Sequence, residues 1–418
     1  MSEKNEVLNR IRYLVGNDSI IAECGSTPAL PTFSDEAVSF LGDLSGELLS
    51  VKGIRQHQDV ISYAYWIRKA SLKREKQNTS DVGIRIGRGM AFHIAPSNVP
   101  VNFAVSMTSS LLAGNITVIR VSNKEFEEVD IICKAINKLL EKPEHEVIKK
   151  HICIIRYDHC DDITEYLSSV CDVRIIWGGD NTIGEIRRFP IPSRAIEMCF
   201  ADRYSLAVID AKYYSVTVKD NSAGKENAEK IARKFYTDTY YSDQNACSSP
   251  RIVVWITGAV SRTELNECRD IFWSSLQKEA DERYDMQPVQ AIDKLSNFAE
   301  LAMKIGGAEL TNRQNNRLFV INIKEARSEA ADYKTGGGFF LQYEAGTVEE
   351  IVPFLGKQCQ TVAVMGIEKK DIVRLVRQYG VRGVDRVVDI GDTMGLEFVW
   401  DGYKMIESMS RVVYVFER

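Results

Sequence analysis

The sequence lacks several patterns that would assign it at once to a large class of proteins. It has no apolar run of about 18 residues, so it contains no candidate membrane span. It shows no signal pattern of a basic start, an apolar stretch and small residues, so a cytoplasmic location is expected. The net charge is −5, and no basic patch of the kind that nucleic acid requires stands out. What is left is a soluble globular protein of 418 residues, long enough to bury a sizeable core.

The cysteines follow no pattern that would pair them or bind metal. The nine cysteines include no Cys-x-x-Cys pair, and an odd number without a signal pattern predicts reduced thiols instead of a disulfide framework. The stretch HICIIRYDHCDD (151–162) holds histidine and cysteine, but the spacing matches no ordinary zinc site, and CIIRY is typical of a buried strand. We therefore expect no metal.

Histidine and glycine residues do not fall where a histidine-activated cysteine hydrolase or an ordinary Rossmann site would need them. All five histidines lie at or before residue 159, and only His93 falls near a candidate active-site loop, where it belongs to a strand pattern. A cysteine hydrolase activated by histidine is therefore disfavoured. The glycines of GIRIGRG (83–89) and WGGDNTIG (177–184) do not fit G-x-G-x-x-G, which excludes an ordinary Rossmann site.

The spacing of apolar residues predicts an α/β protein. The first 80 residues have helical spacing, and Ser34 is a candidate N-cap for SDEAVSFLGDLSGELL. Strands and helices then alternate, which indicates doubly wound parallel sheets. Within this pattern Gly114 is a natural C-cap for the helix expected at 101–114, and two further helices are expected near 261–282 and 289–305. We expect a helical part at 1–80, one α/β domain at 81–220, a second at 221–385 and a C-terminal segment at 386–418. The tail SRVVYVFER is typical of a strand without a later partner in the chain, and such strands often join another subunit's sheet.

One cysteine lies in a distinctive local sequence. Cys247 is part of YSDQNACSSPR (241–251), among small polar residues and directly before the apolar run IVVW. A nucleophilic thiol must be partly exposed, and this loop offers that setting. We predict that Cys247 is a candidate nucleophile, with a buried structural cysteine as the alternative.

Two further segments place polar residues and glycines between a strand and a helix, where ligands bind in parallel sheets. HIAPSNVPVN (93–102) carries Asn98, an amide that could stabilise an oxyanion beside a nucleophile, although a simple Asn- and Pro-containing turn is the alternative. WGGDNTIGEIRR (177–188) carries Gly178 and Gly179, which permit a ligand to approach the backbone closely. Gly184 in the same segment is expected to let the helix pack tightly.

These segments, in this order, resemble the aldehyde dehydrogenase superfamily. IAPSNVPVN is similar to its Pro-x-Asn-x-Pro loop, GNITVIRVSNK to its strand beside the adenosine ribose, WGGDNTIG to its Gly-x-x-x-x-Gly turn, and NACSSPR to its catalytic cysteine segment. With GMAFHIAPSNVPVNFAVSMTSSLLAGNITVIRVSNK and WDGYKM, the likeness extends to the LuxC-type acyl-CoA reductases from about residue 80 onward. These are the reductase component of the bacterial luminescence fatty-acid reductase system.

The resemblance implies an aldehyde dehydrogenase-like fold with a cofactor domain, a catalytic domain and an oligomerisation strand. It also implies NADPH-dependent reduction of an acyl thioester to an aldehyde through an S-acyl-cysteine. Cys247 would attack the thioester, and Asn98 with the Cys247 backbone N–H would hold the oxyanion. Glu197 in IEMCFADRYS is the candidate acid/base, although the glycines of the superfamily's Glu-Leu-Gly-Gly element are missing there.

The resemblance further implies a set of cofactor-binding residues. They are Ala95, Pro96, Ser97, Arg120, Ser122, Asn123, Lys124, Gly178, Gly179, Asp180 and Gly184. The superfamily's NAD users keep a carboxylate near position 123 for the ribose hydroxyls. Asn123 and its flanking cations therefore favour NADP.

The resemblance also implies partners and leaves alternatives. The acyl donor would be acyl-CoA, an acyl carrier or an acylated protein, with an acyl-protein synthetase or acyltransferase as a further partner and a homodimer or homotetramer as the assembly. One alternative is an NAD(P)-dependent aldehyde dehydrogenase that makes an acid. Another is a non-catalytic acyl-binding partner in a multienzyme complex. The poor match around Glu197 favours acyl reduction, because a reductase need not activate water.

Overall fold

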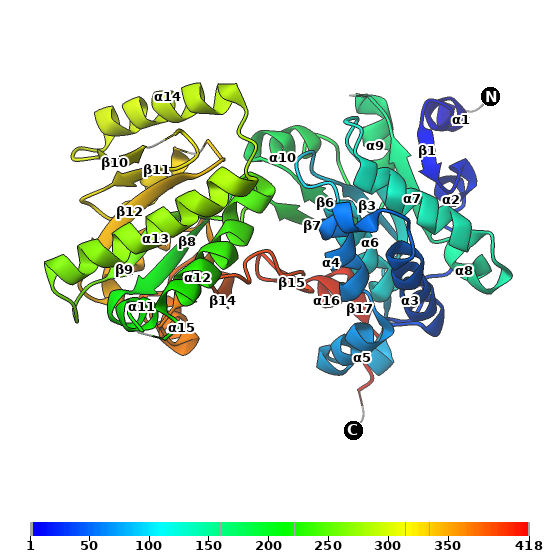
Figure 1. Cartoon of the computed structure of the whole chain (residues 1–418). Helices are drawn as coiled ribbons and strands as arrows, with labels where there is room; N and C mark the ends of the chain where they lie inside the picture. Colours follow the sequence, from blue (N-terminus) through cyan, green and yellow to red (C-terminus); the bar gives the residue numbers. More distant parts are fainter. Residues whose placement is uncertain (1–2, 159, 221, 314, 334, 417–418) are drawn as a thin grey trace. The chain divides into compact units, whose positions relative to one another are not determined.

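The computed structural model describes residues 3–158, 160–220, 222–313, 315–333 and 335–416. The chain forms two units (Figure 1): unit 1 contains residues 1–201 and 396–418, and unit 2 contains residues 202–395. The boundary expected at residue 220 therefore lies at residue 201. The reason is that strand β8 (Tyr204–Asp210) pairs with two strands of the unit 2 sheet.

Unit 1 is built on a six-stranded sheet in the order β1-β5-β4-β3-β6-β7. Its strands are β1 (Arg12–Val15), β3 (Met90–Ile94), β4 (Ile116–Arg120), β5 (Ile152–Arg156), β6 (Val173–Trp177) and β7 (Ile196–Phe200). Only β1 pairs antiparallel with its neighbour. Successive residues of β3 face opposite sides, since Ala91 packs into one core and Phe92 into the other. Strand β1 lies within the part that was expected to be wholly helical.

Helices cover both faces of this sheet, as a doubly wound fold requires. One face is covered by α3 (Asp35–Leu49), α4 (Gln58–Trp66), α5 (Lys69–Asn78), α6 (Asn102–Ala113), α7 (Glu127–Leu140) and α8 (Glu146–Lys149). The other is covered by α1 (Glu3–Leu8), α2 (Asp18–Ala22), α9 (Asp161–Val170) and α10 (Asp180–Ile186). Ser34 caps α3 as predicted, because its side chain accepts a hydrogen bond from the Ala37 N–H. Gly114 ends α6 with φ of 93°, also as predicted.

Unit 2 contains a seven-stranded sheet in the order β10-β11-β12-β9-β8-β13-β14, in which only β10 is antiparallel. Its other strands are β9 (Pro250–Ile256), β10 (Glu309–Arg313), β11 (Phe319–Asn322), β12 (Phe339–Ala345), β13 (Cys359–Met365) and β14 (Arg386–Asp389). One face packs against α11 (Ala211–Val218), α12 (Gly224–Thr239) and α13 (Arg262–Arg283). The other packs against α14 (Pro288–Lys304), α15 (Lys369–Tyr379) and short 3-10 helices. The sequence pattern predicted α13 and α14 at nearly these positions.

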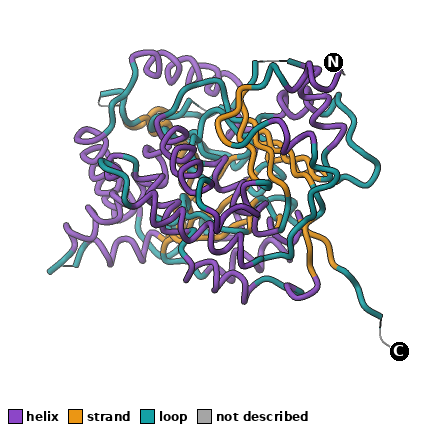
Figure 2. Tube along the Cα trace, turned by 90° about the vertical axis from the view of Figure 1, so that its right-hand side faces the viewer, coloured by secondary structure: helices purple, strands orange, loops and turns teal. Residues whose placement is uncertain are grey.

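The C-terminal segment returns to unit 1 and pairs within its own chain. A hairpin of β15 (Val399–Trp400) and β16 (Tyr403–Lys404) leads through α16 (Met405–Met409) to β17 (Ser410–Val412). Strand β17 pairs antiparallel with β2 (Arg85–Gly87), an earlier segment of the same chain that the sequence pattern had not indicated as its partner. Figure 2 shows the chain end running on from this strand pair. Among the described residues, every helix is too short or too polar to span a lipid bilayer.

Asp238 anchors the loop that contains Gly391 and Thr393, near the end of unit 2. Its buried carboxylate accepts hydrogen bonds from the backbone N–H groups of Gly391, at 2.6 Å, and Thr393, at 3.1 Å. Burial raises the pKa of Asp238 to about 6, although these N–H groups oppose the rise. The folded protein therefore binds a proton more tightly than the unfolded chain, whose aspartate pKa is about 4. This contribution to stability is complete below about pH 4 and is lost as the pH rises to about 6.

We expect Asp238→Ala to remove this part of the pH dependence. It should also lower the free energy of unfolding by about 1–3 kcal/mol, because two buried N–H groups lose their acceptor. Urea unfolding of wild type and variant at several pH values from 4 to 8 measures both effects. If the free energy of unfolding changed with pH in the same way in both proteins, Asp238 would not be the group responsible for this pH dependence.

Candidate active site

The predicted cofactor residues lie at the carboxyl ends of three neighbouring parallel strands of unit 1. Ala95, Pro96, Ser97 and Asn98 follow β3, Ser122, Asn123 and Lys124 follow β4, and Gly178 and Gly179 follow β6. Ser97 and Asn98 are exposed. A small hollow at the ends of β3 and β4 is lined by Ala95, Pro96, Pro100, Phe103, Val121, Ser122, Phe126 and Val129. The sequence segments thus converge on the edge where α/β sheets bind ligands.

Two cations and a carboxylate surround the loop after β4. The Arg120 guanidinium lies 4.8 Å from the ring centre of Tyr157. Lys124 is exposed, and its backbone N–H donates to the Ser122 hydroxyl at 3.2 Å. The Asn123 amide donates to the carboxylate of Asp158 at 2.9 Å. The NADP argument considered only the residue at position 123 and its neighbours in sequence, whereas Asp158, from the end of β5 35 residues later, brings a carboxylate beside Asn123.

The glycine turn after β6 begins helix α10. Gly179 is its N-cap, Asp180 is its first residue, and the Gly178 N–H donates to the Phe200 carbonyl at 3.2 Å. A Cβ added at Gly178 would lie 3.1 Å from Thr182, so this glycine permits a tight turn. The packing role expected of Gly184 was wrong, since an added Cβ there would meet no atom within 4 Å.

Glu197 is engaged in ion pairs on β7. Its carboxylate accepts hydrogen bonds from Arg174, at 2.8 Å and 2.5 Å, and from Arg187 at 2.6 Å. Burial tends to raise the pKa of Glu197, but the two arginines hold it below its usual value. The sequence had not linked these residues, although Arg187 was visible in the glycine-turn segment.

His93 is fully buried in the middle of the sheet. Its Nδ1 lies 2.7 Å from the Ser106 hydroxyl, which also accepts from the Trp177 indole N–H at 3.1 Å. Burial lowers the pKa of His93 to about 3, so the ring is neutral at working pH. His93 is therefore a core residue. His159, which belonged to the discarded zinc pattern, lies outside the described residues.

Cys247 belongs to unit 2, in the loop before the amino end of β9. Its side chain is partly buried, as is true of Cys24, Cys160 and Cys199, whereas the other cysteines are buried. The Ser205 hydroxyl donates to the Cys247 carbonyl at 2.7 Å and fixes the loop to β8. Asn98 and the cofactor residues belong to unit 1, so each unit carries part of the predicted site.

A partly buried arginine contacts the loop that carries Cys247, since the Arg251 guanidinium donates to the Gln244 carbonyl at 3.5 Å. Burial lowers the pKa of Arg251, and the charges of Cys247 and Asp202 oppose that change. A neighbouring cation favours the thiolate, which is the reactive form of cysteine. Arg251 ends the stretch NACSSPR, but sequence alone could not show that its guanidinium returns to the Gln244 carbonyl of the same loop.

Comparisons with known proteins agree with this geometry. The model of the family described as acyl-CoA reductase (LuxC) matches residues 55–412. Long-chain acyl-protein thioester reductase 2 of Photobacterium leiognathi is 23% identical over 319 residues, and long-chain acyl-protein thioester reductase of Aliivibrio fischeri is 22% identical over 312 residues. The matches cover 73% of this chain but only 59% and 58% of those relatives, so the chain spans less than two thirds of their length.

Solved structures show the fold. The glyceraldehyde-3-phosphate dehydrogenase GapN of Methanocaldococcus jannaschii, complexed with NADP, is 13% identical with a TM-score of 0.65, covering 98% of this chain and 93% of that chain. Lactaldehyde dehydrogenase of Escherichia coli is 13% identical with a TM-score of 0.63, covering 99% of this chain and 91% of that chain. The chain has the aldehyde dehydrogenase fold and belongs to the acyl-CoA reductase (LuxC) family.

Proposed function

We propose that this protein reduces an acyl thioester to the aldehyde through an S-acyl intermediate on Cys247. The observation that carries the proposal is a partly buried thiol in a loop before a parallel strand, where the Arg251 guanidinium donates to the Gln244 carbonyl of the same loop at 3.5 Å. Such a setting favours a reactive thiolate. The printed names of the curated relatives, long-chain acyl-protein thioester reductases, support acyl thioesters as the substrate class.

The proposed reaction uses this chain's residues in two stages. The Cys247 thiolate attacks the carbonyl carbon of the thioester, and the Asn98 amide stabilises the oxyanion that forms. The carrier's thiol then leaves with a proton, and the acyl group stays on Cys247. Bound nicotinamide cofactor supplies hydride to the acyl carbon. The C–S bond then breaks, the neutral aldehyde is released, and Cys247 is again a thiolate.

We propose that Glu197 has a structural role and does not activate water. A general base must be able to take a proton, whereas the Glu197 carboxylate is held by Arg174 and Arg187, which lower its pKa. These contacts connect β7 with β6 and with the end of α10. The absence of an activated water would protect an acyl-enzyme from hydrolysis. This supports acyl reduction over aldehyde oxidation.

We also propose the donor and assembly that the family implies. The donor would be a long-chain acyl group on coenzyme A, a carrier or a protein, and a synthetase or acyltransferase would supply it in the cytoplasm. A homodimer or homotetramer would use the tail after β17, because it exposes the consecutive side chains Val413, Tyr414, Val415 and Phe416. Exposed apolar segments of this kind are suited to pairing with the sheet edge of another chain.

The cofactor proposal is NADPH, and the pair Lys124 and Asp158 tests it. The residues present suit an anionic dinucleotide, because glycines and cations gather at the strand ends. We expect Lys124→Ala to raise the KM for NADPH by about tenfold and to affect NADH less, since a charged hydrogen bond contributes about 1.5–3 kcal/mol. Asp158→Asn should lower the KM for NADPH, because it removes a negative charge near the 2′-phosphate.

Initial rates with both cofactors measure this preference. Lys134→Ala, an exposed lysine on α7, serves as the control. If Asp158→Asn instead weakens NADH binding and leaves NADPH unchanged, the carboxylate grips the ribose hydroxyls and NADH is the cofactor.

The function itself is tested with a panel of acyl-CoAs. We expect NADPH oxidation and aldehyde formation in equal amounts. Acid formation from an aldehyde, with no aldehyde formed from any acyl-CoA or acyl-protein, would contradict the proposal.

A further inference from the structure

The loop that carries Cys247 has a backbone conformation that its surroundings must enforce. Asp243 and Gln244 have φ of 54° and 56°, in the left-handed region that residues with side chains rarely adopt. The facing loop, residues 336–338, consists of three glycines with φ of 72°, 58° and 86°. Such strain persists only where other contacts hold it, and it concentrates at functional sites.

The Gln244 side chain links these two loops. It is buried, and its amide nitrogen donates to the carbonyls of Pro250, at 3.1 Å, and Phe339, at 3.2 Å. Its amide oxygen accepts from the N–H groups of Gly338, at 2.9 Å, and Phe339, at 3.0 Å. Both the nitrogen and the oxygen of the amide are thus hydrogen-bonded. They fix the loop that carries Cys247, here called the nucleophile loop, to the start of β12.

Helix α14 holds the same two loops from its buried side. Gln290 donates to the Asp243 carboxylate at 2.9 Å and 3.0 Å, and the Tyr284 hydroxyl donates to it as well. One turn later, the buried Lys294 ammonium donates to the Gly337 carbonyl and, at 2.7 Å, to the Asn316 carbonyl. Burial lowers the pKa of Lys294 to about 8, with Asp243 opposing the change.

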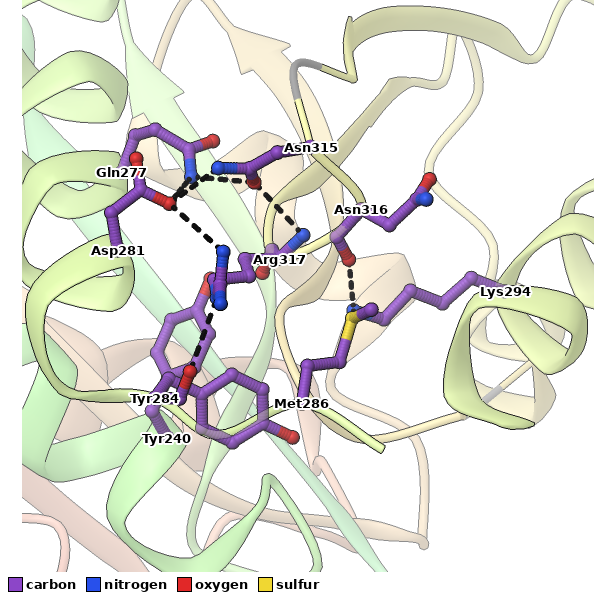
Figure 3. A network of polar contacts seen from close by, with 9 residues as sticks. All are labelled: Tyr240, Gln277, Asp281, Tyr284, Met286, Lys294, Asn315, Asn316 and Arg317. Atoms are coloured by element: carbon purple, nitrogen blue, oxygen red, sulfur yellow. Dashed lines mark hydrogen bonds and ion pairs between the residues drawn. The ribbon is translucent and has the colours of Figure 1, made fainter. Parts of the chain in front are cut away.

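Figure 3 shows Lys294 pointing from α14 toward Asn316, while α13 holds the neighbouring residues from the other side. Gln277 of α13 donates to the Asn315 side chain at 3.0 Å, and the Arg317 guanidinium donates to the Tyr284 carbonyl at 3.1 Å. The residues that contact the nucleophile loop are therefore held in place by further hydrogen bonds.

The first half of α14 is unusual for a surface helix. It buries Gln290 and Lys294 while Val289 and Ile292 are 57% and 66% exposed, whereas the second half buries Leu301 in the usual way. An ordinary surface helix turns its apolar face to the core. Departures from this pattern of burial are expected mainly at functional sites.

We propose that Gln244 is a positioning residue for the Cys247 thiol and that Gln290 and Lys294 complete a clamp around its loop. The inference rests on the proposed function, in which this thiol attacks a thioester. Displacing a nucleophile by about 1 Å costs about 100-fold in rate. The clamp contributes to the reaction by preventing that displacement.

Gln244→Leu tests the proposal, with Gln342→Leu as the matched control. Gln342 is also buried and makes hydrogen bonds to Trp255, Trp273 and Asn322. It lies on β12, three residues after Phe339, the residue that Gln244 contacts. Two rates are measured on the full chain: S-acylation by acyl-CoA, and alkylation of Cys247 by iodoacetamide between pH 6 and 9. Melting temperatures are recorded beside them.

We expect both variants to lose thermal stability. Only Gln244→Leu should slow S-acylation, by about 10- to 100-fold, and change the pH profile of alkylation at Cys247. Equal rates in wild type, Gln244→Leu and Gln342→Leu would overturn the proposal.

A second pair of variants covers the case in which Gln244→Leu does not fold. Lys294→Met should slow S-acylation, and Lys294→Arg, which keeps the donors, should restore part of the rate. Wild-type rates in Lys294→Met would count against the clamp. Alkylation needs neither acyl donor nor cofactor, so it still tests the positioning role if the proposed reaction itself fails.

Discussion

Cys247→Ala is expected to reduce aldehyde formation from acyl thioesters to the background rate. The proposed reaction passes through a covalent bond to this sulfur, and removal of a nucleophile commonly costs several orders of magnitude in kcat. Aldehyde production from acyl-CoA and NADPH measures the loss. Binding of NADPH should persist, because the predicted cofactor residues belong to unit 1 and Cys247 belongs to unit 2.

Cys160→Ala provides the matched control for this variant. Cys160 is also only partly buried, and its thiol lies 2.8 Å from the Asp162 carboxylate in unit 1. Its substitution should leave aldehyde formation unchanged. Full activity of Cys247→Ala, or equal losses in the two variants, would remove Cys247 from the mechanism.

Asn98→Ala is expected to slow acylation of Cys247 by about 10² to 10³. The Asn98 side chain is exposed in the loop after β3, where an amide can donate to a developing oxyanion. Its loss should appear in the rate of adduct formation and leave the melting temperature of the protein nearly unchanged. Stopped-flow or quenched single-turnover measurements with acyl-CoA resolve this step.

Asn78→Ala, which makes the same substitution at an exposed asparagine at the end of α5, is the control for Asn98→Ala. It should acylate at the wild-type rate. An equal rate in Asn98→Ala would mean that the oxyanion is stabilised by other donors.

The local parts of the fold could be predicted from sequence because they depend on neighbouring residues. The N-cap at Ser34, the left-handed end of α6 at Gly114 and the positions of α13 and α14 all follow from short patterns, and the structure confirms them. The alternation of strands and helices was also sufficient to predict two doubly wound sheets.

Features that depend on distant segments could not be predicted in this way. Asp158 meets Asn123 across 35 residues of chain, and β17 pairs with β2 across more than 300. Gln244 was part of the quoted nucleophile segment, yet its partner loop at 336–338 begins more than 90 residues later. Sequence patterns report periodicity and turns, whereas these contacts are set by how the sheets assemble.

The role of Glu197 was also difficult to predict from sequence, because it depends on contacts with distant residues. A glutamate beside a weak family motif suggested an acid/base, but its role depends on which charges surround it. The pairing of β6 with β7 places Arg174 opposite Glu197, and α10 supplies Arg187. The resulting ion pairs use the carboxylate, which is why we propose a structural role.

The most direct test of the central claim is the mass of the intact protein after incubation with a series of acyl-CoAs, followed by addition of NADPH. We predict an adduct of one acyl group on wild type, absent from Cys247→Ala, that disappears with NADPH as aldehyde is released. An adduct that persists in Cys247→Ala, or one that NADPH discharges without aldehyde, would contradict acyl reduction through this cysteine.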